Sequence, residues 1–579
     1  MISLKKLAGS LREYKKVTIL TPVLVTFEVI MEVLIPFLMA NLIDFGINAG
    51  DINIVLKIGL ALIISALLSL LFGTFAGKYA AQAAAGFAHN LRKDIYYKIQ
   101  DFSFSNIDKF STSSLVTRLT TDVTNLQEAF QMLIRLAIRA PIMILFSLTV
   151  AFTISSEITI IILCAIPFLA LGLYLIMTRA YPIFDKVFRA YDKLNNVVQE
   201  NVRGIRVVKT FTREKHEKEK FSQASSGIYK DYSSAEKLIA LNMPMMQLVM
   251  YVCVLLLSWF GATLIVGGSL TTGQLTSLFT YTFQILFSLM ALALVLVTVT
   301  ISRASAKRII EVLTETPDLQ NPEKIITQVK DGSVSFKNVN FSYAKNPNKL
   351  CLSNVSIDVK PGETIGIIGG TGSSKSTFVQ LIPRLYDVTG GAVTVGGIDV
   401  RAYDLKTLRN EVGMVLQKNV LFSGTIKENL RWGNKDASDQ EMVKACKLAQ
   451  ADAFIRSFPK GYDTYIEQDG TNISGGQKQR LCIARALLKQ PKVLILDDST
   501  SAVDTKTDAL IRQAFQEEIP NTTKFIIAQR VTSVKDADRI IVMDGGKINA
   551  VGTHEELLIS NLIYQEVYGS QIKGGISGD

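Results

Sequence analysis

The sequence is poor in the residues that build metal centres and disulfide frameworks. The cysteines number only five and occur without a CxxC pair: Cys164, Cys253, Cys351, Cys446 and Cys482. Their spacing therefore argues against both a zinc site and a disulfide scaffold. Histidine is scarcer still, since only His89, His216 and His554 are present.

Two further signals are missing. The net charge is +11, but no basic block with interleaved aromatic residues occurs, and Lys and Arg gather beside apolar segments. We therefore expect no nucleic-acid partner. The opening residues, MISLKKLAGSLREYKK, contain no short apolar core with a small-residue cleavage site. We expect no cleaved signal peptide, and the first apolar helix would serve as its own insertion signal.

Long apolar stretches are abundant, as the 48% hydrophobic content indicates. Six stretches are long enough to cross a bilayer as helices. They span residues 17–45, 58–77, 135–154, 158–178, 238–266 and 275–301. No charged residue occurs between Lys237 and Arg303, which is typical of membrane helices and unusual for a buried soluble helix.

The distribution of Lys and Arg predicts the orientation of these helices. The short loops 46–53, 155–157 and 267–274 contain neither residue, whereas the opposite helix ends are basic. Both termini are therefore predicted to be cytoplasmic. Residues 78–131 and 179–237 are polar and helix-patterned, so we expect helices that continue beyond the membrane and contact a soluble domain.

The composition changes after Arg308, which predicts three parts. Residues 1–310 form the transmembrane domain, and residues 311–330 form a polar linker that contains Pro317 and Pro322. Residues 331–579 form a soluble α/β domain, whose first strand is predicted from the alternating VSFKNVNFSY.

A phosphate-binding loop is predicted within ETIGIIGGTGSSKST. A short apolar strand leads through a glycine-rich turn into a helix, an arrangement whose backbone amides point at phosphate oxygens. Lys375 would reach the β and γ phosphates, and the Ser376 hydroxyl would hold Mg²⁺. The pattern departs from the usual one at Ser374, where glycine is expected. The loop comprises Gly369, Gly370, Thr371, Gly372, Ser373, Ser374, Lys375, Ser376 and Thr377.

Two later segments support a nucleotide site. PKVLILDDST is a continuous apolar run that predicts a buried parallel strand, and its Asp497 is placed to hold Mg²⁺. ISGGQKQR, residues 473–480, then resembles the signature sequence of ATP-binding cassette (ABC) proteins. With this segment the chain resembles a bacterial heterodimeric multidrug ABC exporter, in the half-transporter layout of six membrane helices followed by one cassette.

This resemblance implies a fold and assigns roles to further residues. The fold is an all-α six-helix transmembrane domain fused to an α/β P-loop ATP-binding cassette, with ATP and Mg²⁺ as ligands. Tyr343 resembles the aromatic that stacks on adenine, and Gln417 resembles the glutamine that senses Mg²⁺. Two segments would act at a cassette dimer interface: the signature residues Ser474, Gly475, Gly476 and Gln477, and the loop Ser501, Ala502, Val503 and Asp504.

Two positions depart from the family pattern. Asp498 stands where the family has a catalytic glutamate, and Gln529 stands where it has a histidine. Without general acid–base assistance, which contributes about 10² to 10⁴ in rate, this site is predicted to bind ATP and to cleave it slowly. The intact signature would complete the site of a partner half-transporter that carries the glutamate and the histidine.

The transported compound is left open by the sequence. Glu28 and Glu32 lie four residues apart on one face of the first membrane helix. They would recognise cationic amphiphilic drugs, or they would form a packing ion pair with Arg135 or Arg139. Small hydrophobic or cationic compounds are thus the expected substrates in a bacterial plasma membrane, with membrane lipid as the surrounding partner. The alternatives are a lipid or peptide exporter and a mainly regulatory subunit.

Overall fold

The chain forms two compact units in the computed structural model, which describes residues 2–576. The first unit runs to Gln100, resumes at Thr112 and ends at Glu315. The second unit comprises Asp101–Ser111 and the chain from Thr316 onward. Eleven residues that lie between two helices of the first unit in the sequence therefore belong to the second unit. Each unit has its own core.

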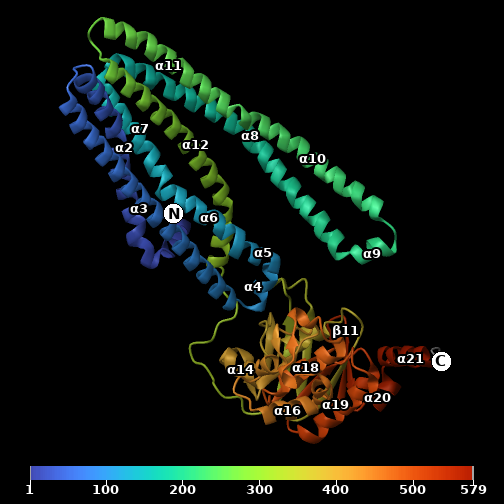
Figure 1. Ribbon diagram of the computed structural model, residues 1–579. Helices are drawn as coiled ribbons and strands as arrows, with labels where there is room; N and C mark the ends of the chain where they lie inside the picture. The colour runs from blue at the N-terminus through green and yellow to red at the C-terminus, as the bar shows by residue number, and fades with distance from the viewer. Residues whose placement is uncertain (1, 577–579) are drawn as a thin grey trace. The chain divides into compact units, whose positions relative to one another are not determined.

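The first unit is entirely helical (Figure 1). Its longest helices are α2 (Lys15–Asn41), α3 (Ile52–Gln100), α7 (Leu136–Ile154), α8 (Ser156–Arg203), α10 (Glu214–Ala240), α11 (Asn242–Val266) and α12 (Thr272–Thr314). Shorter helical segments complete it: α1 (Ile2–Gly9), η1 (Arg12–Tyr14), η2 (Leu42–Ile47), α5 (Thr112–Thr117), η3 (Arg118–Asp122), α6 (Val123–Ile134) and α9 (Ile205–Thr210).

The six predicted membrane helices are confirmed. Six helical segments are long and apolar enough to cross a bilayer: Arg12–Ile47, Ile52–Gln100, Thr112–Ile154, Ser156–Phe184, Glu214–Val266 and Thr272–Thr314. On α3 the side chains of Leu56, Leu60, Ile63, Leu67 and Leu70 are 59–67% exposed. A helical face this apolar is stable against lipid and not against water. The protein is therefore a multi-pass membrane protein.

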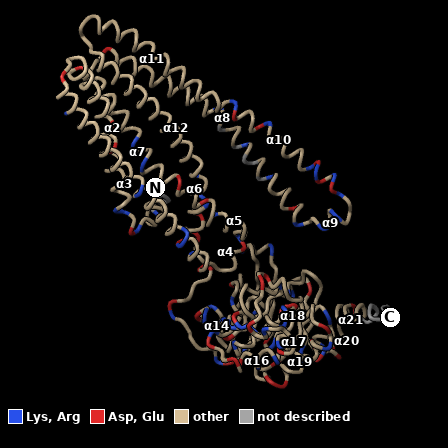
Figure 2. The backbone as a smooth tube through the Cα atoms, in the orientation of Figure 1, with Lys and Arg blue, Asp and Glu red and all other residues tan. Residues whose placement is uncertain are grey.

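Charged residues are sparse at one end of the helical unit (Figure 2). They gather at the opposite end, around α9 and the adjoining part of α10. The helix α12 continues to Thr314, so its last turn overlaps the predicted linker 311–330. It does so because Ile309 and Val312 are fully buried and extend its packed face.

The second unit is built on a six-stranded sheet in the order β12-β11-β3-β10-β9-β6. A four-stranded sheet, β2-β1-β4-β5, and the short pair β7-β8 accompany it. The strands are β1 (Val334–Phe341), β2 (Leu352–Val359), β3 (Thr364–Ile368), β4 (Gly390–Val395), β5 (Ile398–Asp399), β6 (Val412–Val415), β7 (Gly424–Thr425), β8 (Tyr465–Ile466), β9 (Val493–Asp497), β10 (Thr523–Ile527), β11 (Arg539–Asp544) and β12 (Lys547–Gly552).

Helices surround these sheets. They are α4 (Phe104–Lys109), α13 (Lys375–Gln380), α14 (Leu405–Glu411), α15 (Ile426–Arg431), α16 (Asp439–Leu448), α17 (Asp452–Ser457), α18 (Gly475–Leu487), α19 (Thr505–Glu518), α20 (His554–Ser560) and α21 (Leu562–Ile576). The large sheet is apolar on both faces, because Val493 and Ile495 belong to one core cluster and Leu494 and Leu496 to the other. A central parallel strand is expected to be a continuous run of apolar residues, because it is buried on both faces.

Candidate functional site

Parallel strands bring the predicted ATP-binding segments to one edge of the large sheet. The strand β10 lies between β3 and β9, and Ile527 pairs with both Ile367 and Asp497. Carboxyl ends of parallel strands meet at the same edge. The phosphate loop after β3, the acids at the end of β9 and Gln529 after β10 are therefore neighbours.

The phosphate loop closes around the ammonium group of Lys375. Lys375 Nζ donates to the carbonyl oxygens of Gly369 at 2.8 Å and Gly370 at 2.9 Å. Burial lowers the pKa of Lys375, against the attraction of Asp497 and Asp498. A lysine held by loop carbonyls can transfer its hydrogen bonds to phosphate oxygens when these arrive.

The backbone explains why glycine is expected at two positions of the loop. A Cβ on Gly369 would lie 2.2 Å from the carbonyl oxygen of Met543, so no side chain fits there. Ser374 adopts φ 71° and ψ 25°, the left-handed conformation that glycine adopts without strain. The serine that interrupts the sequence pattern therefore occupies a conformation unfavourable for residues with a Cβ.

Asp497 and Ser376 are hydrogen bonded to each other and are the predicted Mg²⁺ ligands. Ser376 Oγ donates to Asp497 Oδ1 at 2.9 Å, and the Asp497 residue is 2% exposed. Burial raises the pKa of Asp497, and the neighbouring Asp498 charge adds to the shift. A hydroxyl and a carboxylate at this separation are hard oxygen ligands of the kind Mg²⁺ prefers, so the residues fit the ion.

Asp498 and Gln529 are hydrogen bonded to each other. Gln529 Nε2 donates to Asp498 Oδ2 at 2.6 Å. Burial raises the pKa of Asp498, and hydrogen bonds from the side chains of Gln529 and Gln417 oppose this shift. Gln417 therefore lies next to Asp498. The Asp498 carboxylate already has two amide partners.

Tyr343 lies beside Thr377, the last residue of the predicted phosphate loop, and is 47% exposed. Its hydroxyl is 3.0 Å from Thr377 Oγ1, on the first turn of α13. The ring packs edge-on against Phe341 and Tyr386, at centroid distances of 4.8 and 5.1 Å. One exposed aromatic face supported by two further rings can stack on a nucleobase.

The signature segment caps the helix α18. Ser474 Oγ accepts from Gln477 N at 3.3 Å, and Ser474 N donates to Gln477 Oε1 at 3.0 Å. Such a helix N-terminus favours anions. The interface loop packs directly against it, because a Cβ on Gly476 would lie 2.8 Å from the carbonyl oxygen of Ala502.

Gln479 joins the signature helix to the interface loop, and the sequence had not singled it out. Its Oε1 accepts from Ala502 N at 3.0 Å, and its Nε2 donates to Ser501 Oγ at 3.2 Å. Asp504 then accepts from Thr507 N at 2.9 Å and begins α19. The only available sequence signal was the position of Gln479 one turn beyond Gly475 on the same helix.

Tyr386 is a second residue that sequence reasoning missed. Its hydroxyl donates to Asp108 Oδ2 of α4 at 2.6 Å, and its ring also lies edge-on to Phe104 at 6.1 Å. The same ring supports Tyr343. Tyr386 therefore connects α4 to the predicted adenine platform within the second unit. No local signal relates residues so distant in sequence.

The predicted substrate residues meet inside the helical unit. Arg139 forms an ion pair with Glu32 and lies 3.6 Å from Glu28 Oε1 through its Nε. The Glu28 residue is 8% exposed, and its Oε2 has no hydrogen-bond partner among the described residues. Gln284 Nε2 of α12 donates to the Glu32 carbonyl oxygen at 3.4 Å. The packing ion pair with Arg139 is thus present.

Two protein-family models match this chain, one in each of its two main parts. A family model described as the ABC transporter transmembrane region matches residues 18–290. A second model, described as ABC transporter, matches residues 352–501. Segment 101–111 therefore lies within the matched transmembrane region although it packs with the second unit.

Relatives of similar length are found in bacteria. An uncharacterized ABC transporter ATP-binding protein of Bacillus subtilis strain 168, YfiB, is 37% identical over 568 residues, which cover 98% of each chain. A fatty acid ABC transporter ATP-binding/permease protein of Mycobacterium bovis is 32% identical over 82% of this chain and 75% of its own.

A solved structure shares the fold of the whole chain. The structure of a bacterial Atm1-family ABC exporter with ATP bound is similar over 96% of this chain and 99% of that one, with a TM-score of 0.83. Its sequence is 23% identical to this chain, so the similarity concerns the fold.

Proposed function

Because the chain belongs to the ABC transporter family, as a half-transporter with one transmembrane region and one cassette, we propose that it is the nucleotide-holding half of an asymmetric exporter. ABC exporters work as dimers, so each ATP lies between two cassettes. This chain would bind ATP at its own phosphate loop and lend its signature residues to the partner's site.

The hydrogen bond between Gln529 and Asp498 carries the proposal. An ATPase needs a base or orienting carboxylate within reach of the attacking water. The Asp498 side chain is one methylene shorter than glutamate, and the Gln529 amide occupies its Oδ2 at 2.6 Å. The amide of Gln529 can neither accept a proton nor carry charge. ATP bound here would remain uncleaved for long periods.

The other residues of the site are suited to holding nucleotide. Tyr343 would stack on adenine, and Lys375 with the loop amides would bind the phosphates. Ser376 and Asp497 would hold Mg²⁺, which when bound neutralises phosphate charge, and Gln417 would lie beside it. Ser474, Gly475 and Gly476 would donate toward the γ phosphate on the partner.

The transported compounds are proposed to be amphiphilic and hydrophobic, moved outward across a bacterial plasma membrane by alternating access. Both termini and the cassette would be cytoplasmic, in line with the basic helix ends. Multidrug export is the first candidate. The bacterial relatives and the exporter fold support outward transport across a bacterial membrane and do not bear on the class of compound.

An anionic lipid-like substrate, such as a fatty acid, is the second candidate. Arg139 pairs with Glu32 and Glu28, so its single positive charge balances one of the two carboxylates and leaves less negative charge for a cationic drug. The Arg135 side chain forms no hydrogen bond or close ion pair among residues 2–576, although it interacts electrostatically with Glu28, and its Nη1 lies 3.3 Å from the point where a Cβ on Gly77 would stand. An arginine at membrane depth requires a counterion, which a carboxylate headgroup supplies. One relative is named a fatty acid transporter.

The test of the asymmetric role is a pair of ATPase measurements. The chain purified alone is expected to hydrolyse ATP slowly, and its co-purifying partner is expected to carry glutamate and histidine at the positions of Asp498 and Gln529. The double substitution D498E/Q529H should raise turnover at this site by about 10² or more. Full-rate hydrolysis by the unmodified chain alone would refute the proposal.

A further inference from the structure

The segment that follows β10 is held at both ends, and between them few side chains hydrogen bond to its backbone. Ala528 N still donates to Ile367 O of β3, at 3.3 Å. At the far end, Ser533 Oγ donates to Asp508 Oδ2 of α19 at 2.9 Å. Residues 529–532, which we call the switch segment, join these two anchored points.

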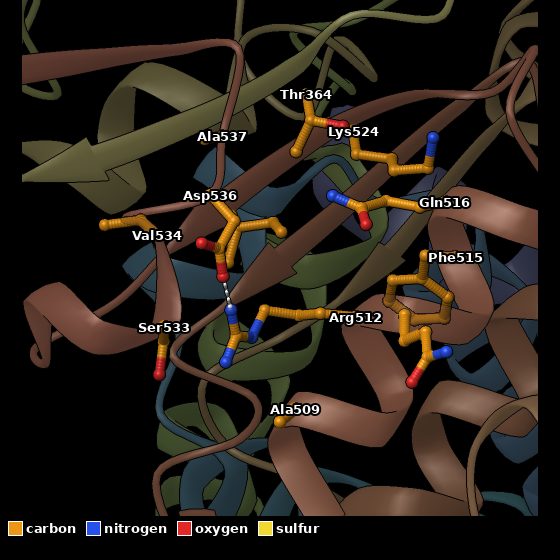
Figure 3. A pocket seen from close by; sticks show the side chains of 12 residues that line it. Thr364, Ala509, Arg512, Phe515, Gln516, Lys524, Ser533, Val534, Asp536 and Ala537 are labelled. Carbon is orange, nitrogen blue, oxygen red and sulfur yellow. Dashed lines mark hydrogen bonds and ion pairs between the residues drawn. The ribbon is translucent and has the colours of Figure 1, made fainter. Parts of the chain in front are cut away.

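The anchor on α19 is a buried polar group beside a small cavity of about 130 Å³. Arg512 Nη1 donates to Asp536 Oδ2 at 2.7 Å across the same region (Figure 3). Ser533 and Val534 line this cavity together with Arg512. The chain beyond the switch segment is therefore fastened to the helix that begins at the interface loop.

The switch segment itself is held by the last helix of the chain. Gln571 Nε2 of α21 donates to the carbonyl oxygen of Gln529 at 2.8 Å. Gln571 Oε1 accepts from the backbone N–H of Val531 at 2.9 Å. In the described part of the chain, no other side chain outside the segment hydrogen bonds to the backbone of residues 529–531.

The helix α21 is itself firmly attached to the cassette. Tyr564 is fully buried, and its hydroxyl is 2.7 Å from His554 Nδ1. Val567 and Tyr568 pack against the core cluster that contains Val531. Gln571 lies two turns after Tyr564, so the two residues share a helical face. The amide of Gln571 is therefore presented on a rigid support.

We propose that Gln571 is a positioning residue for the ATP site, through which α21 fixes the backbone of Gln529 and hence the Gln529–Asp498 hydrogen bond. The side chain of Gln571 bonds the backbone of Gln529 and Val531, and it has no hydrogen bond to Asp498 or Lys375 among the described residues. It acts by setting where the residue at position 529 stands. The catalytic consequence rests on the proposed function of position 529, whereas the structural consequence does not.

The primary test measures backbone protection in the full chain assembled with its partner. Gln571→Met keeps the length of the side chain and removes both hydrogen bonds. Amide hydrogen exchange in peptides covering Val531 should become about fivefold faster, as expected for the loss of one backbone hydrogen bond. Gln571→Glu retains the acceptor for Val531 N but places a carboxylate oxygen against the Gln529 carbonyl oxygen, so it should also accelerate exchange.

Gln565→Met is the matched control. Gln565 lies on the same helix, and its Nε2 donates to the carbonyl oxygens of Leu558 at 2.7 Å and Ile559 at 3.2 Å, away from the switch segment. It should leave exchange at Val531 unchanged. Unchanged exchange in Gln571→Met, or equal acceleration in Gln565→Met, would overturn the proposal.

Measurement of kcat distinguishes a positioning role of Gln571 from a general effect on the stability of the cassette. In the D498E/Q529H background, Gln571→Met should lower kcat at least about fivefold with the KM for ATP unchanged, and Gln565→Met should alter neither. If D498E/Q529H gains no activity, the proposed function fails while the exchange measurement still decides the role of Gln571. If activity is gained and Gln571→Met leaves kcat unchanged, Gln571 does not position residue 529.

Discussion

At the scale of single residues, the predicted ATP site at the edge of the large sheet contains an unfavourable backbone conformation. Ser374 is in the left-handed region at φ 71°, directly before Lys375. For residues with a Cβ this region costs about 1–2 kcal/mol, which glycine avoids. The serine is therefore expected to destabilise the predicted phosphate loop, independently of the changes at Asp498 and Gln529.

Replacing Ser374 by glycine should stabilise the phosphate loop. Because glycine also gains entropy in the unfolded chain, the net gain is expected to be up to about 1 kcal/mol. The melting temperature of the full chain and its affinity for ATP should both increase, as measured by thermal unfolding and by ATP binding. Ser374→Ala keeps the Cβ and removes the hydroxyl, so it should give no gain. Equal gains from both variants would show that the hydroxyl, and not the backbone, is responsible.

The acids at the end of β9 predict a pH dependence. Burial raises the pKa values of Asp497 and Asp498, so these groups bind protons more readily in the folded than in the unfolded chain. Their contribution to stability without nucleotide therefore increases as pH falls through the folded-state pKa. Mg²⁺ binding has the opposite dependence, because it needs the ionised Asp497 carboxylate.

Isothermal titration of Mg²⁺·ATP from about pH 7.5 to about pH 5 measures this second effect. Affinity should fall toward acid pH in the unmodified chain. Asp497→Asn removes the titrating ligand, so its weaker binding should depend less on pH. A pH dependence equal to that of the unmodified chain would assign the titration to another group.

At the scale of elements, the helix α4 is connected to the predicted adenine platform through one side chain. Tyr386 donates to Asp108 and packs against Tyr343. Burial and the hydrogen bond to Asp108 raise the pKa of Tyr386, so its phenol remains a donor at neutral pH. The sequence on either side of α4 lies within the matched membrane region, so we expect movement there to reach the platform through Tyr386.

Tyr386→Phe should weaken the connection between substrate and ATP turnover. It keeps the aromatic packing and removes the hydrogen bond, which contributes about 1 kcal/mol at this exposed carboxylate. Stimulation of ATPase by substrate in the assembled transporter should fall several-fold, roughly in proportion to that energy. Tyr403→Phe is the control, because its hydroxyl donates at 2.8 Å to Val395 O inside the cassette. Equal loss in both variants would indicate general destabilisation.

At the scale of the whole molecule, the charged cluster in the helical unit separates the two substrate classes. Long-chain carboxylates should stimulate ATPase through Arg135, and Arg135→Gln should abolish this stimulation without affecting stimulation by cationic drugs. Arg139→Gln should instead destabilise the unit, because it leaves Glu28 and Glu32 unpaired. Such uncompensated buried charge costs about 3–5 kcal/mol.

Assays in vesicles that contain this chain assembled with its partner measure the stimulation of ATPase by long-chain carboxylates and by cationic drugs. Stimulation by cationic drugs alone would favour multidrug export. Stimulation by neither class, with normal ATPase of the partner, would favour a mainly regulatory subunit.

The sequence by itself determined the elements. Uninterrupted apolar runs, such as the one between Lys237 and Arg303, specify membrane helices because lipid excludes unpaired charge. The strand and helix that flank the predicted phosphate loop, and the β9 strand, were also predicted correctly, since β3, α13 and β9 occupy the expected segments. These features depend on the order of apolar, polar and glycine residues over short stretches, which can be recognised in one sequence.

Only the tertiary structure decided which distant residues meet. Strand order places β10 between β3 and β9, so that Gln529 reaches Asp498 across 31 positions of sequence. The packing of α21 puts Gln571 on the switch segment, and residues 101–111 join the cassette despite lying between membrane helices. These contacts arise from the burial of whole faces of helices and sheets, which no local pattern specifies.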